Sequence, residues 1–320
     1  MKGVKKILIK NKSALAGVIE ALLLVGLVAI ILSTIQLVYI PEIMKQKESS
    51  HLDEVENQFA NIKSVIDTQS MMGVMQSDEA IAYSPMFSPV KLGVKELPYF
   101  VTSNVYGRIQ ITDIDDSNNL IDIKPSISDD KYINGVPLTS IEYILSSMYH
   151  DDIREFKYIY EGGGVIRNQT GSPNSTGEAM KVNPPITVEN NSGSIKIYYY
   201  IPVFRCPPGK NNVGNSILTK YIRTNYSNHL KHTTPPGTLT DPAAHYIKIY
   251  SDHLDAWYSC FMDNRLGLLW EYEKNNYIDV VYHSQETNPY IEINPDDWDI
   301  EVDFTIVEIG IQTGYGTVIT

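Results

Sequence analysis

The chain has 320 residues, 43% of them hydrophobic, which suffices for one large domain or two ordinary ones with a substantial core. The formal net charge is −12, although residues 1–40 carry five lysines and one acid, so the remainder is strongly acidic. An acidic exterior of this kind repels phosphate backbones and argues against nucleic acid as a partner.

An almost unbroken apolar run from Ala14 to Ile40 follows the lysine-rich residues 1–13. At about 1.5 Å per residue the run is about 40 Å long, which exceeds the roughly 30 Å hydrocarbon layer of a membrane. The sequence therefore predicts a transmembrane helix over residues 14–40, in contact with membrane lipid. A secretory signal peptide has a shorter apolar region that ends in a small-residue cleavage site, and no such site follows this run before Pro41. Because the lysines precede the helix, we expect a cytoplasmic leader (1–13) and an extracellular C-terminal domain.

The acid Glu20 lies within the apolar run, near its cytoplasmic end. An intramembrane carboxylate is costly and is therefore a functional candidate; the plainer interpretation is an acid close to the lipid headgroups. A lysine-rich leader, the small residues Ala14, Ala16 and Gly17, and a glutamate shortly after them resemble the class III leader of type IV pilins.

This resemblance implies cleavage by a dedicated peptidase within the candidate processing region Ala14-Leu15-Ala16-Gly17. A cut before Ala16 makes Glu20 the fifth residue and places Leu15 ahead of the cut, whereas a cut after Ala16 makes Glu20 the fourth. The resemblance also implies that Glu20 sets helix register during assembly, with the chain itself or other pilin-like subunits as partners. Whether the leader is cleaved stays open at this point.

The next segment, residues 41–75, is predicted to form a helical stalk. We expect a bend at Pro41, a helix to about Met72 and a stop at Gly73. Apolar residues recur along it at spacings of three and four: Leu52, Val55, Phe59, Ile62 and Ile66. Such a stripe is typical of a helix that packs on its own domain, which we favour, or of a dimeric coiled coil.

Residues 76–320 show the alternating pattern of β-strands. The predicted strands are Tyr99–Thr112, Lys157–Tyr160, Ile195–Ile201, Tyr246–Tyr250, Tyr277–Tyr282 and Ile300–Ile311, with a phase slip at Val307 typical of a bulge or a sheet crossing. Two short helices are predicted, one at Thr139–Met148 from a capping-box pattern and one carrying Leu254, Trp257 and Phe261. The predicted fold class is α+β: a long N-terminal helix (transmembrane plus stalk) and a mainly antiparallel β-sandwich-like domain with short helices.

The sequence of the domain expected outside the cell suggests two kinds of covalent modification, a disulfide and N-linked glycans. The two cysteines, Cys206 and Cys260, either form a disulfide or remain buried thiols. Sequons that could accept covalent glycans begin at Asn168, Asn174, Asn190 and Asn225. The 22 tyrosines are good strand formers, and a sugar-stacking surface is the less favoured interpretation of their abundance.

The sequence contains no motif that points to catalysis or to a cofactor. Neither Gly162–Gly164 nor Gly209-Lys210 continues as a phosphate-binding loop, and HExxH and GxSxG are absent. The acidic clusters at 113–116 and 296–299 lack calcium-loop spacing, and the histidine pair His229 and His232 is only a weak metal pattern. We therefore expect no enzyme activity, no cofactor and no metal.

Three segments resemble parts of uncharacterised, singly anchored envelope proteins of archaea, especially methanogens. They are residues 88–98, residues 159–163 and residues 247–257. That resemblance carries no known activity. The expected function is a structural, pilin-like cell-surface protein, a subunit or minor component of an extracellular filament with a hydrophobic helix core. The alternative is an unprocessed single-pass envelope protein that binds a partner or glycan through its β-domain.

Overall fold

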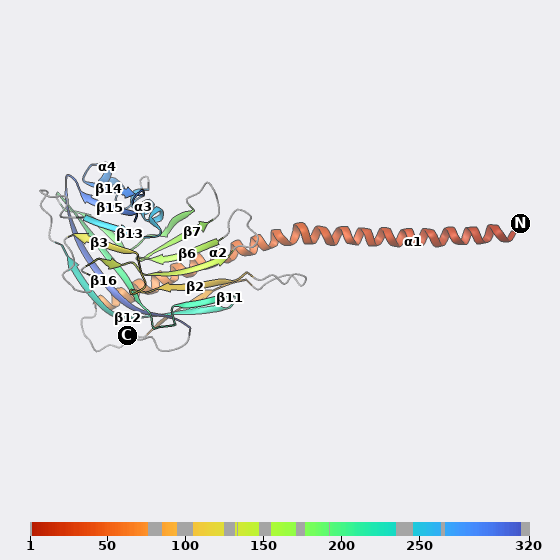
Figure 1. Cartoon of the computed structure of the whole chain (residues 1–320), viewed down its shortest axis with the longest axis horizontal. Helices are drawn as coiled ribbons and strands as arrows, with labels where there is room; N and C mark the ends of the chain where they lie inside the picture. Colours follow the sequence, from red (N-terminus) through yellow and green to blue (C-terminus); the bar gives the residue numbers. More distant parts are fainter. Residues whose placement is uncertain are drawn as a thin grey trace. The chain divides into compact units, whose positions relative to one another are not determined.

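The computed structural model describes residues 2–75, 85–94, 105–124, 132, 134–146, 155–170, 177–191, 193–234, 246–263 and 266–314, with side chains from Ala16 onward except Thr170. The chain divides into two compact units, residues 1–50 and 51–320, and each is described by itself. A long N-terminal helix is followed by three mostly antiparallel β-sheets with short helices (Figure 1). The predicted α+β fold class is confirmed.

The N-terminal unit consists of α1 (Lys2–Thr34), the π-helical turn η1 (Ile35–Tyr39) and the start of α2 (Ile40–Met75). The π turn lies directly before Pro41, and the Ile40 N–H donates to the Ile35 carbonyl. Because proline has no N–H and crowds the preceding turn, the wider turn relieves a helix that would otherwise break there. The disturbance expected at Pro41 therefore takes the form of a π turn within a continuous helix.

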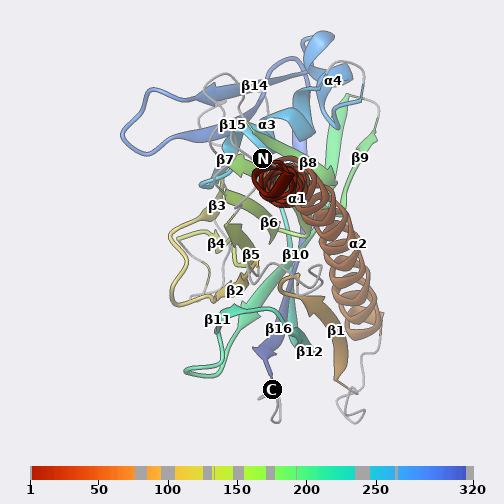
Figure 2. The ribbon, with the colours of Figure 1, turned by 90° about the vertical axis from the view of Figure 1, so that its right-hand side faces the viewer.

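The part of α2 in the second unit packs on its own domain. The whole apolar stripe predicted for it is buried, and Val55, Phe59, Ile62 and Ile66 are each 0% exposed. These side chains share one hydrophobic core with strands, which we call the α2 core. Figure 2 shows α2 beside β1 (Met86–Lys91), where the Lys91 N–H donates to Gln58 Oε1 at 2.9 Å. The interpretation of the stripe as domain packing is confirmed.

The helix does not stop at Gly73, as the sequence suggested, but continues to Met75. A Cβ atom at Gly73 would overlap the ring of Tyr226. Glycine is thus needed at this position for a close approach between the helix and a strand, rather than for helix termination.

Replacing Gly73 by alanine is expected to lower the thermal midpoint of unfolding. Overpacking against Tyr226 costs about 1–3 kcal/mol, which exceeds the gain of about 1 kcal/mol that alanine gives over glycine inside a helix. In a Tyr226→Ala background the same change should become neutral or stabilising. An equal destabilisation in both backgrounds would contradict the proposed contact.

The strands form three sheets. The first has the order β1, β12 (Thr219–Thr233), β16 (Asp299–Thr313), β10 (Ser194–Arg205), β9 (Ile186–Asn190). The second has the order β11 (Asn212–Ser216), β2 (Gly107–Thr112), β5 (Ser140–Ser146), β6 (Glu155–Glu161), β7 (Gly164–Thr170), β8 (Glu178–Val182). The third has the order β14 (Ile278–His283), β15 (Tyr290–Pro295), β13 (Tyr246–Tyr250), β3 (Leu120–Lys124), β4 (Val136–Pro137). Among the described strands, only β10 and β16 pair in parallel.

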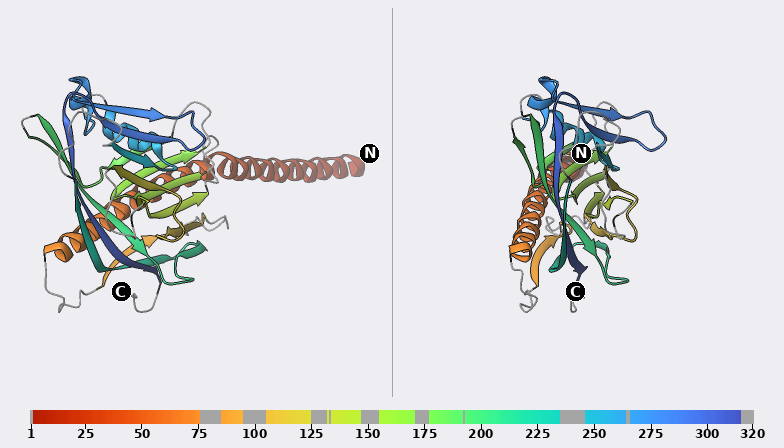
Figure 3. Two further views of the ribbon diagram at one scale, coloured as in Figure 1. Left: turned by 60° about the vertical axis from the view of Figure 1, so that its left-hand side comes forward. Right: turned by 90° about the vertical axis from the view of Figure 1, so that its left-hand side faces the viewer.

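A second hydrophobic core surrounds α3 (Leu254–Met262), and we call it the α3 core. Strand β16 belongs to both cores, because Val302, Phe304 and Ile306 lie in the α3 core whereas Val307 and Ile309 lie in the α2 core. Figure 3 shows the long strands of the first sheet, teal to blue, running through the domain. The phase slip at Val307 is thus a crossing between cores, and the bulge lies opposite, in β12 between Tyr226 and Asn228.

The strands predicted at 157–160, 195–201, 246–250, 277–282 and 300–311 are confirmed, as is the helix at Leu254–Phe261. Of the strand predicted at 99–112, residues 107–112 are confirmed and residues 99–104 lie outside the described part of the chain. The helix predicted at Thr139–Met148 is wrong, because Ser140–Ser146 form β5 between β2 and β6. The Thr139 hydroxyl does not cap a helix but accepts the Phe204 N–H at 2.9 Å.

Candidate functional site

The N-terminal residues singled out from the sequence all lie on α1. Ala16, Gly17 and Glu20 are exposed, whereas the side chains of Ala14 and Leu15 lie outside the described part. The residues from 16 to 39 are exposed throughout, and Leu37 is 77% exposed. Within the described residues, this is the one helix that is long and apolar enough to cross a membrane, as an anchor or as a signal sequence.

The disulfide that the sequence left open is not formed, since both cysteines are free thiols. Cys206 is half-buried beside the α2 core, whereas Cys260 is buried on α3 and its Sγ donates to Asn183 Oδ1 at 3.7 Å. Burial raises the pKa of Cys206 to about 11 and that of Cys260 to about 12. Both thiols are therefore protonated, and hence weakly nucleophilic, at neutral pH.

The sequons differ in their accessibility. Asn190 ends β9 and is exposed, whereas Asn225 is 8% exposed within β12, so the folded domain has no room for a glycan on its amide. The Asn168 amide nitrogen is engaged as a donor to Glu178 Oε1. Asn174 lies outside the described residues.

The weak metal patterns gain no support in the described part of the chain, where no group of three His, Cys, Asp or Glu side chains could hold an ion. His229 and His232 are both on β12, where residues three apart point to opposite faces of the sheet. Asp113 is used structurally, since its Oδ1 accepts the Asp115 N–H at 2.7 Å and its Oδ2 accepts the Cys206 N–H at 3.0 Å.

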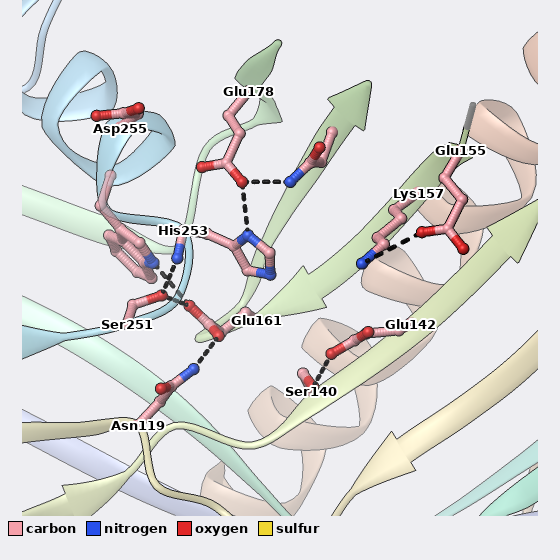
Figure 4. Close-up of polar contacts among 12 residues, drawn as sticks. Asn119, Ser140, Glu142, Glu155, Lys157, Glu161, Glu178, Ser251, His253 and Asp255 are labelled. Atoms are coloured by element: carbon pink, nitrogen blue, oxygen red, sulfur yellow. Dashed lines mark hydrogen bonds and ion pairs between the residues drawn. The ribbon is translucent and has the colours of Figure 1, made fainter. Parts of the chain in front are cut away.

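The most unusual polar group of the domain is Glu161, which ends β6 and is only 1% exposed. Its Oε1 accepts from Ser251 Oγ at 2.6 Å and from Trp257 Nε1 at 2.9 Å, and its Oε2 accepts from Asn119 Nδ2 at 3.2 Å (Figure 4). Burial raises the pKa of Glu161 despite these three hydrogen bonds. One carboxyl group thereby ties together β6, the end of β13, helix α3 and the segment before β3.

The tight turn that follows Glu161 fixes the end of β6, and with it the position of the Glu161 carboxyl group. Gly162 and Gly163 both have positive φ and connect β6 to β7 as a two-residue hairpin loop, a conformation that favours glycine. The Gly162 carbonyl accepts a 2.6 Å hydrogen bond from the buried Tyr199 hydroxyl. Tyr199 lies in the α3 core, so the hairpin is fixed to this core next to Glu161.

A second buried pair lies beside Glu161. His253 Nδ1 contacts Glu178 Oε1 at 2.9 Å, and this carboxylate also accepts from Asn168 (Figure 4). Burial alone would lower the pKa of His253, but the hydrogen bond to Glu178 and the charges of Glu161, Glu178 and Glu142 outweigh it and raise the pKa. The contact with Glu178 thus favours the charged form of His253.

The raised pKa of His253 predicts a pH-dependent contribution to stability. Because the folded pKa lies above the usual 6.5, the stabilisation is complete below pH 6.5 and is lost as the pH rises through the folded pKa. The loss of stability caused by His253→Gln should therefore be larger at about pH 5 than at about pH 9, as measured by thermal unfolding. Glu178→Gln should reduce this difference, and a loss that is equal at both pH values would contradict the assigned pairing.

These buried groups support the wall of a cleft of about 330 Å³. The cleft lies at the end of β13 and is lined by Asn118, Asn119, Glu178, Tyr250, Ser251, Asp252, Leu254, Asp255, Tyr282, Asn288 and Pro289. The Tyr282 hydroxyl donates to Asp255 Oδ1 at 3.1 Å, so this carboxylate is also held in place. The cleft therefore offers carboxylate, amide and hydroxyl groups in defined positions beside tyrosine rings.

Sequence reasoning missed this site. Leu254 and Trp257 had been named only for a helix, Gly162 only for a rejected phosphate loop and Asn168 only for glycosylation, and none of them for these contacts. Strand β6 is buried on both faces, with Ile159 in the α3 core and Tyr160 in the α2 core, and Glu161 at its end is enclosed with them. The one local signal was a glutamate directly before the Gly-Gly turn.

The chain matches no protein family model, no curated protein and no solved structure at a significant level. No family match therefore supports the resemblances to type IV pilins and to archaeal envelope proteins. The feature that the structure does show is a long apolar N-terminal helix followed by a β-rich domain.

Proposed function

We propose that this chain is a pilin-like cell-surface protein, a subunit or minor component of an extracellular filament. The carrying observation is the apolar surface of α1 and η1, which is exposed from residue 16 to residue 39. An apolar surface of this extent is unfavourable in water and requires a cover. Membrane lipid covers it before assembly in this proposal, and the helices of neighbouring subunits cover it afterwards.

The continuity of the helix supports this proposal. The chain remains helical from Lys2 to Met75, and its last part is built into the α2 core through the stripe that includes Phe59 and Ile62. The same helix thus supplies both the apolar segment and, through its residues from Leu52 onward, part of the core of the β-domain. In this proposal the five lysines keep the N-terminus in the cytoplasm, the domain lies outside, and the chain has no catalytic activity.

Electron microscopy of native cells with an antibody to the β-domain tests the proposal. We expect labelled filaments in the fraction sheared from the cell surface. Glu20→Ala should reduce the filaments while the amount of chain in the membrane is maintained, because Glu20 is assigned to subunit register. Glu286→Ala, at an exposed position of the domain, is the matched control and should leave filaments unchanged. A chain found only as a membrane monomer would contradict the proposal.

The second candidate is an unprocessed single-pass envelope protein that binds a partner or glycan through its β-domain. The cleft at the end of β13 favours it, because its polar lining is held by a buried network. If this second function holds, residues 1–13 remain on the mature chain and no filament forms.

A further inference from the structure

We infer that the cleft at the end of β13 is a binding site for a small saccharide without acidic groups, either neutral or amino-substituted. The inference concerns the β-domain alone and goes beyond the proposed filament role. It holds whether or not the N-terminal leader is removed, so its failure would leave the filament proposal untouched.

The chemistry of the lining fits sugar hydroxyls. Carboxylate oxygens of Glu178 and Asp255 are strong acceptors, and the Asn118 and Asn288 amides can both donate and accept. The rings of Tyr250 and Tyr282 supply apolar surface for the C–H faces of a sugar ring, together with Leu254 and Pro289. A volume of about 330 Å³ lies at the lower end of the usual range of about 300–1,000 Å³, so a ligand of one or two rings is expected.

The charge of the lining excludes acidic ligands. Glu178, Asp252 and Asp255 contribute carboxylates, and no lysine or arginine is among the described residues that line the cleft. His253 offsets part of the charge of Glu178, but Asp252 and Asp255 add further negative charge, so the lining repels phosphates, sulfates and uronic acids and attracts amines. The ligand is thereby restricted to hydroxyls, amides and ammonium groups.

The lining is fixed before any ligand arrives. Asn119 and Ser251 both donate to the buried Glu161 carboxylate, at 3.2 Å and 2.6 Å. Glu178 is held by His253 at 2.9 Å, and Asp255 by Tyr282 at 3.1 Å. Holding polar groups in place in this way lowers the entropic cost of binding, and it is the property that separates a built site from an accidental surface groove.

The neighbouring face of the third sheet is a poorer candidate, although it is rich in tyrosine. The Lys248 ammonium lies over the ring of Tyr246 at 4.4 Å and over the ring of Tyr290 at 4.9 Å. His283 stacks on Tyr290 with the ring centroids 4.4 Å apart. The cleft rings also have partners, since Tyr250 lies 5.2 Å from Tyr290 and Tyr282 lies 5.5 Å from Tyr258. The cleft is therefore distinguished by its fixed polar lining rather than by free rings.

Isothermal titration of the full-length chain tests the inference. The chain is placed in phosphatidylcholine nanodiscs, because glycoside detergents would compete for the cleft. The probes are cellobiose, chitobiose, the deacetylated glucosamine dimer and, as the acidic comparison, digalacturonate. We expect at least one of the first three to bind with a Kd below about 1 mM, and digalacturonate to bind at least about tenfold more weakly.

Two exposed or half-exposed positions report on the cleft itself. Asn288→Ala and Tyr250→Ala should each weaken binding by about tenfold or more. Asn190→Ala and Tyr221→Ala remove the same residue types from exposed positions on β9 and β12 and should leave binding unchanged. The inference is overturned if no neutral or amino disaccharide binds at about 10 mM, if digalacturonate binds as tightly, or if Asn288→Ala has no effect.

Discussion

Replacing Phe59 by alanine is expected to lower the free energy of unfolding of the domain by about 3–5 kcal/mol. Phe59 is 0% exposed in the α2 core, and its ring lies 6.1 Å from that of Tyr158 on β6. The substitution leaves a cavity between helix and sheet, and the surrounding strands can close it only partially. Chemical denaturation of the full-length chain, followed by circular dichroism and by tryptophan fluorescence, measures the change.

The two signals also test whether helix and strands form one cooperative unit. Trp257 lies in the α3 core, and β16 contributes side chains to both cores. The unfolding transition seen by tryptophan fluorescence should therefore shift together with the one seen by circular dichroism. Asn61→Ala, on the exposed side of the same helix, should change stability by less than about 0.5 kcal/mol. A fluorescence transition that Phe59→Ala leaves in place would show that the helix is only loosely attached.

Replacing Glu161 by alanine is expected to cost about 1–3 kcal/mol, because the buried Trp257 N–H is left unpaired while the half-buried donors of Ser251 and Asn119 also lose their acceptor. The donors are Trp257 Nε1, Ser251 Oγ and Asn119 Nδ2, which come from three separate segments. The variant should unfold at lower denaturant concentration, and the fluorescence of native Trp257 should change. Asn119 and Ser251 would also be released, so the affinity of the cleft for its ligand should fall.

Matched variants separate the charge from the hydrogen bonds. Glu161→Gln keeps one acceptor oxygen and should be less destabilising than Glu161→Ala. Glu155→Ala removes a glutamate from the same strand, where the side chain is 36% exposed, and should change stability by less than about 0.5 kcal/mol. Equal stability losses for Glu161→Ala and Glu155→Ala would contradict the role of Glu161 as a buried acceptor that links three segments of the chain.

The parts of the fold that depend on local pattern could be predicted from the sequence. The apolar run, the stripe from Leu52 to Ile66 and strands such as Tyr246–Tyr250 follow from residue spacing alone. The helix predicted at Thr139–Met148 failed because pairing with β2 and β6 overrides a local capping pattern. The alternation of Ile141, Tyr143 and Leu145, all buried in the α2 core, was the better signal.

The cleft could not be predicted, because its lining comes from segments that only the sheet topology brings together. Asn119 precedes β3, Glu178 begins β8, Ser251 follows β13 and Asn288 precedes β15. No spacing rule relates these positions along the chain. The parallel pairing of β10 with β16, whose sequences are separated by about a third of the chain, is equally beyond local pattern.

Intact-mass spectrometry of the chain isolated from its native cell surface measures the fate of the leader directly. The pilin-like proposal predicts that the chain in filaments lacks the residues up to Leu15 or Ala16, so that Glu20 lies within the first five residues of the mature helix. Recovery of the complete 36.1 kDa chain as a membrane monomer would contradict it.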